Sequence, residues 1–597
     1  MNRIAFKAVI FFLLLSFSPF FKINSQDKDI WFTTILKEKF TDKNGNTLTG
    51  KGVVIGDIDA GVDIFNPMFF FADGGEYDWI DINNDGVFTP GVDAVMIDGK
   101  QVVLNYIEMK DNTASYFHPA YLRKSPGSFV PDLDFLYADA NNNGKRDYGE
   151  ASGFTEQTPT YGEQLFIAID ANHNGKLDAG EKIVALKTSK VRAIREKDGV
   201  IRRRGIDLIK SNVEGVDHGT GVSGIILGGH YGVQRLHGFA PDAELVMAKV
   251  NYNYTPRFVS TFPDLIRFIK SENVNIMLYE DGEWSWEYMD GSTEEEQLAD
   301  ELARSGITVI GAAGNLATGN MHILDTLLSG QSREYQFKCP AKVSNKKNDG
   351  AFVQYLWKGD DKNLSFKVKT PDNSTSEVLG SGSGFITVGK YHIFYSKDES
   401  SRGTNMFRFG FSEKDSNAVN GNWSITVSTD KDVILNGYLV DISQEWGYIS
   451  KWDSPKLSDI STITFPSTGD SVIIIGAYAV NTGWGEKVGD LCTYSGIGPT
   501  FSYNPGVIIC APGHTTFTTG VGYSYQQFSG TSSAAPHAVG VAALLLQYNP
   551  NLTHSDIKRI FVNSAATDNF TGIVPNAKWG YGKLNAEGAI KYAIENY

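Results

Sequence analysis

Four reactive side chains, each beside a run of small or apolar residues, constrain the possible folds of this chain more than any other feature. Asp59 and Asn315 each end a β-rich apolar run, whereas His218 and Ser532 each precede glycine, alanine and other small residues. Small residues let a helix pack closely against its neighbours, and the free N–H groups at a helix N-terminus favour developing negative charge. A helix cap alone would explain Ser532. All four residues, in the order Asp, His, Asn, Ser, instead predict a nucleophilic site assembled from distant segments.

Apolar segments that alternate with helical segments predict an α/β fold. Residues 53–59, 243–250, 306–312 and 472–477 have the pattern of buried strands, and residues 534–547 that of a helix of small and apolar residues. Buried parallel strands are near-continuous apolar runs because helices cover both faces of their sheet. The predicted fold class is therefore α/β, a parallel sheet with helices on both faces.

Two insertions interrupt this pattern in a chain of 597 residues, which is too long for a single compact core. Residues 71–204 are acidic and rich in Asn, Asp and Gly, whereas residues 329–443 contain short segments in which apolar and polar residues alternate. Alternation with a period of two, interrupted by polar turns, is typical of antiparallel strands. We expect the second insertion to form a β-sandwich or jelly roll.

The four reactive residues lie in sequence boxes that resemble those of the subtilisin-like serine peptidases, the S8 family. The boxes span residues 53–63, 217–224, 311–315 and 528–537. Shorter signatures of the same family stand at residues 238–243, 494–499, 511–513 and 579–582. The resemblance implies a subtilisin-like fold and endopeptidase cleavage of extended peptides.

The resemblance also implies a role for each residue. Ser532 would attack the scissile carbonyl, and His218 would take its proton as a general base. Asp59 would fix the imidazole tautomer, and the Asn315 side-chain amide would help to hold the oxyanion. Asp57 is an alternative for the acid, since it shares a strand face with Asp59. The Asp-Ala-Gly-Val-Asp match to the family favours Asp59.

Two departures from the family pattern affect the predicted catalytic site and substrate cleft. Ala60 stands where the family usually has Ser or Thr. The segment expected to line the cleft, usually Ser-Leu-Gly, reads Met277-Leu278-Tyr279 in this chain. We therefore predict that Leu278 and Tyr279 bind substrate and that the tyrosine narrows or reshapes a subsite.

Two loops of the first insertion have the spacing of EF-hand calcium loops. In residues 139–150 and 170–181, oxygen-bearing side chains occupy positions 1, 3, 5, 9 and 12, and glycine occupies position 6. Such loops bind Ca²⁺ through hard oxygen ligands, with a backbone carbonyl at position 7 and a bidentate glutamate at position 12. The predicted ligands are Asp139, Asn141, Asn143, Lys145, Asp147 and Glu150, and Asp170, Asn172, Asn174, Lys176, Asp178 and Glu181.

A third loop, residues 81–92, begins with the same pattern and ends differently. Its predicted ligands are Asp81, Asn83, Asp85 and the carbonyl of Val87. Position 12 is Val92, and an acidic residue, Asp93, follows one position later. We expect a calcium site of altered geometry in this loop, and ions that stabilise the insertion rather than switch its conformation.

The first residues predict export from the cell. Arg3 and Lys7 supply positive charge ahead of an apolar stretch that runs over residues 9–21. The polar segment after it offers a signal-peptidase cleavage point after Ser25. A membrane anchor is the alternative, but this interrupted run is short for a bilayer span. We expect an exported protein, periplasmic or extracellular, whose mature chain has no membrane span.

Charge and cysteine content narrow the remaining possibilities. The formal net charge of −15 argues against nucleic-acid binding, which needs a basic face. Three cysteines are too few for a disulfide framework in a chain of this size. Cys492 and Cys510 could form a disulfide or remain thiols, and the sequence leaves both possibilities open.

These observations predict an exported serine endopeptidase that acts on protein or peptide substrates and is stabilised by calcium. The alternative is a catalytically weak or inactive subtilase fold that serves as a calcium-dependent binding or adhesion module. The inserted β domain resembles that of clostridial germination subtilases. The predicted division is a signal peptide (1–25), three catalytic segments (26–70, 205–328 and 444–597), the calcium-loop insertion (71–204) and the β domain (329–443).

Overall fold

The structure is a computed structural model. It describes residues 40–112, 127–250, 262–280, 282, 284, 286–343, 345–359, 364–415, 417–442, 449–481, 485–502 and 505–597. The predicted signal peptide therefore lies outside the described residues. Among the residues described, no helix is both long and apolar enough to cross a bilayer.

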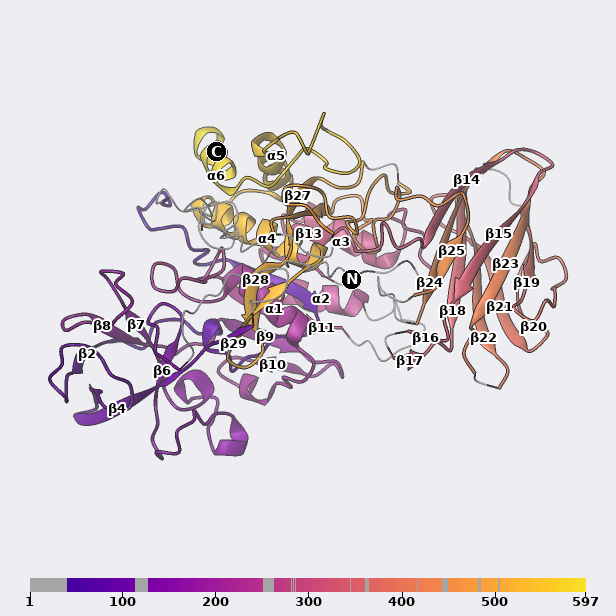
Figure 1. Ribbon diagram of the computed structural model, residues 1–597. Coiled ribbons are helices and arrows are strands. Elements are labelled where there is room, and N and C mark those ends of the chain that lie inside the picture. The colour runs from indigo at the N-terminus through magenta and orange to yellow at the C-terminus, as the bar shows by residue number, and fades with distance from the viewer. Residues whose placement is uncertain are drawn as a thin grey trace, which may run out of the picture.

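An eight-stranded sheet forms the centre of the molecule (Figure 1). Its strands, in spatial order, are β10 (Ile201–Arg203), β9 (Val191–Arg195), β11 (Glu244–Lys249), β1 (Val54–Asp59), β12 (Ile276–Tyr279), β13 (Thr308–Ala312), β26 (Ile473–Ala479) and β27 (Ile509–His514). Every pairing is parallel except that of β10 with β9. The structure therefore has the predicted α/β class, with a parallel sheet at its centre.

Helices cover both faces of this sheet and create two separate apolar cores. Helices α1 (Asp217–Leu227) and α4 (Thr531–Tyr548) pack together on one face, and α2 (Phe262–Ser271) and α3 (Glu294–Arg304) pack together on the other. Two further helices, α5 (His554–Ser564) and α6 (Ala586–Asn596), contact each other beside α4. In β1, Ile55 belongs to the α4 core and Ile58 to the α2 core, as the alternation of a strand requires.

The first insertion folds into a closed six-stranded barrel beside the main sheet (Figure 1). Its strands are β2 (Glu76–Ile80), β3 (Ala94–Ile97), β4 (Lys100–Ile107), β6 (Phe135–Ala138), β7 (Leu165–Ile169) and β8 (Lys182–Ala185). Between β4 and β6, the insertion contributes β5 (Lys110–Asn112) to a small sheet with β28 (Thr516–Gly520) and β29 (Ser524–Phe528). This sheet joins the insertion to the segment that precedes Ser532.

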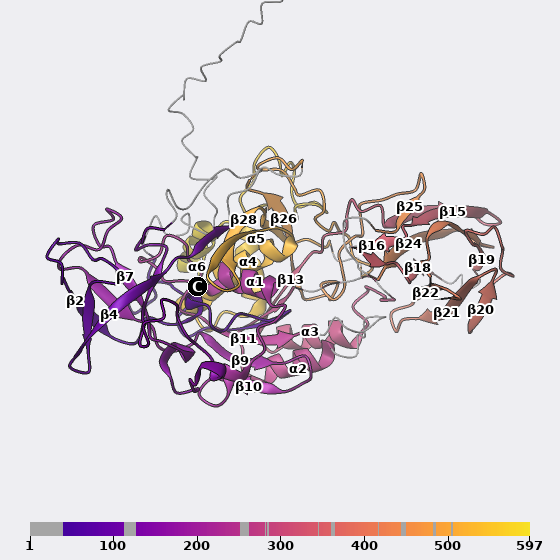
Figure 2. The same ribbon diagram turned by 60° about the horizontal axis from the view of Figure 1, so that its bottom comes forward.

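The second insertion lies at the opposite end of the molecule and contains two facing antiparallel sheets (Figures 1 and 2). One sheet has the order β14 (His322–Leu327), β24 (Val433–Asp441), β18 (Ala351–Lys358), β22 (Thr404–Glu413), β21 (Tyr391–Glu399) and β20 (Ser383–Val388). The other has the order β19 (Ser365–Lys369), β23 (Gly421–Ser428), β15 (Ser332–Cys339) and β25 (Lys451–Asp453), and β16 (Lys342–Val343) pairs with β17 (Lys346–Lys347) beside them. One aromatic-rich core fills the space between the two sheets.

The sheet orders shift two boundaries that the sequence suggested. The predicted first insertion ended at residue 204, but β9 and β10 belong to the main sheet. The predicted β domain covered residues 329–443, but β14 and β25 lie outside that range and pair within its sheets. Both boundaries were placed where composition changes, whereas strand pairing is set by contacts between distant residues.

The three cysteines are buried and free.

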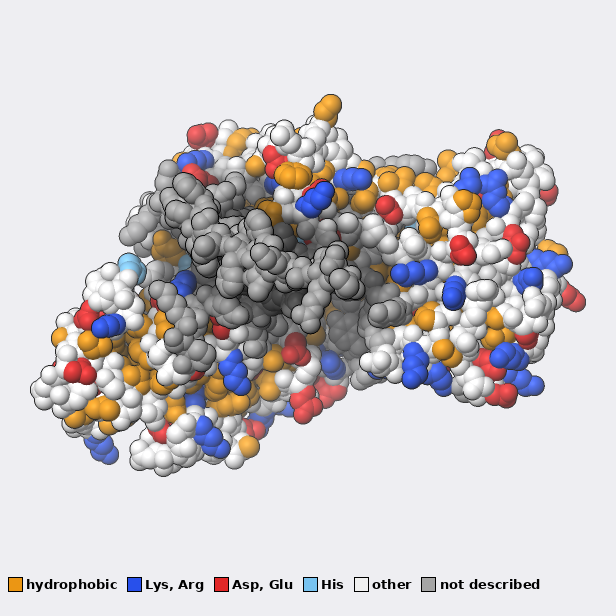
Figure 3. Space-filling model, in the orientation of Figure 1, with side chains coloured by type: hydrophobic (Ala, Val, Ile, Leu, Met, Phe, Trp, Pro, Cys, Tyr) orange, Lys and Arg blue, Asp and Glu red, His pale blue; other side chains and the backbone are white. Residues whose placement is uncertain are grey.

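On the face seen in Figure 3, acidic and basic side chains of the described residues are interspersed over both the barrel and the β-sandwich.

Buried Arg146 fastens the barrel insertion to the main body. Its guanidinium donates hydrogen bonds to the carbonyl oxygens of Thr160 at 2.6 Å, Glu163 at 3.0 Å and Phe65 at 3.4 Å. A fourth bond reaches the hydroxyl of Tyr523 at 3.4 Å. Phe65 follows the Asp59 segment, and Tyr523 lies in the turn between β28 and β29. One side chain therefore links three segments that are distant in sequence.

We predict that Arg146→Met lowers the free energy of unfolding by about 3 kcal/mol, because buried carbonyls would lose charge-assisted hydrogen bonds. Equilibrium denaturation with urea measures the change. The matched control is Arg267→Met, which removes an exposed ion pair with Asp264 and Glu294 and should cost below about 1 kcal/mol. Equal losses of unfolding free energy in the two variants would contradict the role of Arg146 in joining the insertion to the main body.

Candidate active site

Asp59 and His218 meet at the carboxyl end of the central strand β1. Asp59 is the last residue of that strand and is almost fully buried. The Nδ1 atom of His218 lies 2.8 Å from Oδ1 and 2.9 Å from Oδ2 of this carboxylate. His218 is the second residue of α1, and 41% of its side chain is exposed. The contact directs Nδ1 toward the carboxylate and leaves Nε2 as the ring nitrogen that can accept a proton.

Glycine at position 219 allows α1 to approach the Asp59 segment. A Cβ atom there would lie 2.2 Å from the carbonyl oxygen of Gly61 and 3.1 Å from the carboxyl carbon of Asp59. Such overlap would push the start of α1 away from the strand end. The small residues after His218 therefore have a steric role in holding the imidazole against Asp59.

Ser532 stands at the N-terminus of α4, beside Asn315. It is the second residue of the helix, follows Gly530 with φ of 124°, and is 5% exposed. The Asn315 Oδ1 atom accepts hydrogen bonds from the N–H of Thr531 at 2.8 Å and from its hydroxyl at 3.0 Å. These donors fix the amide orientation, so Nδ2 of Asn315 is the atom left to donate near the serine.

Two further carboxyl groups, Asp57 and Glu280, lie in the same region. Asp57 is fully buried in β1, and burial followed by the charge of Asp59 raises its pKa well above the ordinary value. Glu280 directly follows β12 and is 7% exposed. Burial followed by the charges of Asp57 and Asp59 raises the pKa of Glu280, whereas contact with the Ser532 hydroxyl opposes the rise. From the sequence, Asp57 was a candidate only for the partner of His218, and no pattern pointed to Glu280.

The side chains of Leu278 and Tyr279 are enclosed between the sheet and its helices, where they cannot contact substrate as the sequence predicted. Both are fully buried in β12, Leu278 in the α4 core and Tyr279 in the α2 core. The register pairs Tyr279 with Ile58, so that Glu280 is the first residue beyond the paired strand. The prediction placed the cleft segment inside a buried strand.

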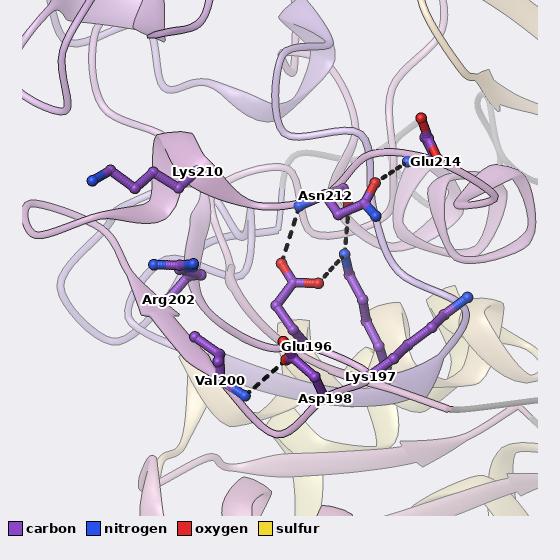
Figure 4. A pocket seen from close by; sticks show the side chains of 9 residues that line it. Glu196, Lys197, Asp198, Val200, Arg202, Lys210, Asn212 and Glu214 are labelled. Atoms are coloured by element: carbon purple, nitrogen blue, oxygen red, sulfur yellow. Dashed lines mark hydrogen bonds and ion pairs between the residues drawn. The ribbon is translucent and has the colours of Figure 1, made fainter.

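A charged pocket lies next to this region, at the end of β11 (Figure 4). Lys249 is paired with Asp59 in the sheet register, but its ammonium donates to Oε2 of Glu196 at 2.7 Å and to the carbonyl of Asn212. The N–H of Asn212 donates in turn to Oε1 of Glu196 at 3.1 Å. Glu196 therefore neutralises Lys249, and the pocket lining contains neither His218 nor Ser532.

The three predicted calcium loops have one common backbone geometry. In each, the aspartate at position 1 accepts the N–H groups of positions 5 and 6. The side chain at position 5 accepts the N–H of position 7. The glycine at position 6 has φ of 80°, 77° and 84° in Gly86, Gly144 and Gly175. This left-handed turn arranges the oxygen-bearing side chains around one side of each loop.

In residues 170–181, the glutamate at position 12 closes the loop. Glu181 accepts the N–H of Ala171 at 2.8 Å and the N–H of Asp178 at 2.8 Å. One carboxylate thus joins positions 2 and 9, where it can face a bound cation.

In the loop at residues 139–150, Glu163 rather than Glu150 is the carboxylate that joins positions 2 and 9. Glu163 accepts the N–H of Ala140 at 2.8 Å and that of Asp147 at 2.9 Å, which are again positions 2 and 9. Glu150 has a half-exposed side chain 3.6 Å from Lys210. The closing position of this loop is therefore filled by a residue outside the twelve-residue pattern, which loop spacing alone could not identify.

In the loop at residues 81–92, Asp93 is the carboxylate that joins positions 2 and 9. Asp93 is fully buried and accepts the N–H of Ile82 at 2.8 Å and that of Thr89 at 2.6 Å. The acidic residue that the sequence placed one position late therefore closes the loop in the same way as Glu181.

Two of the loops are joined to each other through backbone pairing. Val87 forms a β-bridge with Asp178, and the N–H of Phe88 donates to the carbonyl of Leu177 at 2.8 Å. Phe88 and Leu177 both belong to the barrel core. Among the described residues, no three His, Cys, Asp or Glu side chains already converge as a metal cluster. The loops instead combine Asp and Asn oxygens with one carbonyl and one closing carboxylate, a donor set suited to Ca²⁺.

Comparison with known proteins matches residues 50–582 to the model of the family described as "Subtilase family". Serine protease AprX of Bacillus subtilis is 32% identical over 146 residues, which are 22% of this chain and 32% of that protein. The calcium-dependent protease of Trichormus variabilis is 37% identical over 94 residues, 15% of this chain and 14% of that protein. The chain thus spans about a third or less of these two relatives.

The solved structure of the CspB protease of Clostridium perfringens covers 92% of this chain and 96% of its own, with a TM-score of 0.63 and 16% identity. At this identity the likeness concerns the fold.

We predict that the hydrogen bond between His218 and Asp59 gives a strongly downfield Nδ1 proton signal in ¹H NMR spectra. Asp59→Asn should remove or displace this signal, because the carboxylate acceptor is lost. Asp57→Asn is the matched control and should keep the signal. Loss of the signal in the control alone would assign the acid role to Asp57 instead.

Proposed function

Because this chain belongs to the subtilase family, we propose that it is a serine endopeptidase that hydrolyses peptide bonds in protein or peptide substrates. The observation that carries this proposal is the close contact between His218 and Asp59 on the face of the sheet where α4 presents Ser532. The relative named a serine protease supports the same reaction class.

In the proposed reaction, Ser532 is the nucleophile. His218 accepts the hydroxyl proton at Nε2 and later delivers it to the leaving amine, while Asp59 holds the imidazole orientation and stabilises its cationic form. Water then attacks the acyl-enzyme by the same proton route. The Asn315 amide and the N–H groups at the start of α4 stabilise the negative charge on the carbonyl oxygen.

We also propose that the barrel insertion binds calcium. The loops at residues 81–92, 139–150 and 170–181 would hold the ions, closed by Asp93, Glu163 and Glu181. Bound Ca²⁺ supplies positive charge that offsets the clustered oxygens. The relative named a calcium-dependent protease supports this proposal.

Export to the periplasm or the medium also stands as a proposal. It rests on the predicted signal peptide at residues 1–25.

A fluorophosphonate probe tests the peptidase proposal. The purified wild-type chain should be labelled covalently, and Ser532→Ala should abolish labelling. Ser533→Ala is the matched control, because that hydroxyl hydrogen-bonds to Thr516 and should not be needed for the reaction. Absence of labelling in folded, calcium-loaded wild type would reject the peptidase and favour the calcium-dependent binding module.

Calcium titration with isothermal calorimetry tests the loop assignment. Glu163→Gln should weaken calcium binding by about tenfold or more, because a closing carboxylate charge is removed. Glu150→Gln, eleven positions after Asp139, is the matched control and should bind calcium as wild type does. A chelator should lower the melting temperature of the wild type, since an ion that binds only the folded state stabilises it. Weaker binding in the control and not in Glu163→Gln would contradict the corrected assignment.

A further inference from the structure

Three carboxyl groups on one face of the sheet, those of Asp57, Asp59 and Glu280, lie near enough for their charges to act on one another. Asp59 contacts His218, as described above. Asp57 is 0% exposed and Glu280 is 7% exposed. All four carboxyl oxygens of these two residues are buried; among the described residues Asp57 has no hydrogen-bond partner, and Glu280 has only its contact with the Ser532 hydroxyl. Such groups require an explanation, since burying an unpaired carboxylate costs several kcal/mol.

Strand register places Asp57 and Glu280 on the same face of the sheet. Asp57 comes two residues after Ile55, and Glu280 comes two residues after Leu278, which is paired with Asp57. Ile55 and Leu278 both belong to the α4 core. The two carboxyl groups therefore lie between the sheet and the helix whose N-terminus carries the nucleophile.

The charged groups on neighbouring elements leave this pair without a cation. His218, on α1, is committed to Asp59, and Lys249, on β11, is committed to Glu196. His537, on α4, is fully buried, and burial lowers its pKa to about 4, so that it is neutral at pH 7. Among the described residues, no lysine or arginine lies close enough to lower the pKa of Asp57 or Glu280.

A proton is the simplest counterion for such a pair. Two carboxylates that share one buried site cannot both ionise readily, so one of them keeps its proton to a higher pH. A bound metal ion is the alternative, but the described residues contain no convergent group of three His, Cys, Asp or Glu side chains that could hold one.

We propose that Asp57 and Glu280 share one proton at neutral pH and form an acid pair beneath Ser532, and that loss of this proton slows attack by the serine. The catalytic half of the proposal rests on the proposed peptidase function. The shared proton does not depend on it.

The chemical consequence follows from the charge balance. With the proton in place, the pair carries one negative charge, and after the proton leaves to solvent it carries two. Attack by Ser532 places a negative charge on the substrate carbonyl oxygen, and nearby negative charge raises the energy of that state. Acylation should therefore slow as the pH rises through the pKa of the pair.

The pH dependence of kcat/KM tests the catalytic half. In the wild type, kcat/KM should fall as the pH rises through the pKa of the pair, by up to about tenfold per pH unit, toward the lower value of the deprotonated form. Glu280→Gln and Asp57→Asn should lack this alkaline limb. In each variant an amide can donate a hydrogen bond to the remaining carboxylate, so the site carries one negative charge at any alkaline pH. Glu296→Gln is the matched control. It removes a buried carboxyl group that already accepts hydrogen bonds from Thr293 and Thr468, and the alkaline limb should stay unchanged.

Infrared difference spectroscopy tests the proton without any activity. The wild type at pH 7 should show a protonated-carboxyl stretch that is lost in both Glu280→Gln and Asp57→Asn, each of which serves as a check if the other fails to fold. No lost band in either variant overturns the proposal. A lost band with an unchanged alkaline limb overturns its catalytic half. If the band is lost but the fluorophosphonate probe does not label the wild type, the acid pair is supported and the peptidase proposal is rejected.

Discussion

The hydrogen bond between Asp59 and His218 joins residues 159 positions apart, and the arrangement of the rest of the chain depends on that contact. Asp59 is placed by β1, which β11 and β12 flank in parallel register. His218 is placed by a helix that can approach only because Gly219 has no Cβ. The intervening residues must leave the sheet and return to it, and the barrel insertion does so between β1 and β9. A large insertion is compatible with the site because both of its ends are anchored in the main sheet.

Much of this organisation could be predicted from the sequence because its causes are local. Buried parallel strands require continuous apolar runs, and a helix that approaches a strand end requires small residues, so both features are visible in short windows. The loop turns were also predictable, since only glycine takes a left-handed φ at position 6 without strain. These patterns led to Asp59, His218, Asn315 and Ser532 as candidates, and the structure brings Asp59 to His218 and Asn315 to the turn before Ser532.

The features that the sequence did not reveal arise from pairing between distant residues. Glu163 closes a loop whose first residue is 24 positions earlier, beyond any fixed calcium-loop spacing. The exact end of β12 depends on its register with β1, and this register decides that Glu280, not Tyr279, follows the buried strand. The acid pair has no local signature at all, because Asp57 and Glu280 come from different strands.

The structure uses buried charge in two opposite ways, and the difference shows what each region is built to do. Arg146 is surrounded by carbonyl oxygens that satisfy its donors, and these contacts tie the loop at residues 139–150 to the turn that leads into β29 and then to Ser532. Among the described residues, Asp57 has no hydrogen-bond partner and Glu280 has only its contact with the Ser532 hydroxyl, and burial raises the pKa of both. An unfolded chain releases those protons near the ordinary carboxyl pKa while the folded chain retains one, so the pair costs stability as the pH rises from that value to its own pKa. A group that destabilises the fold in this range is better explained by its position beside the nucleophile than by a structural need.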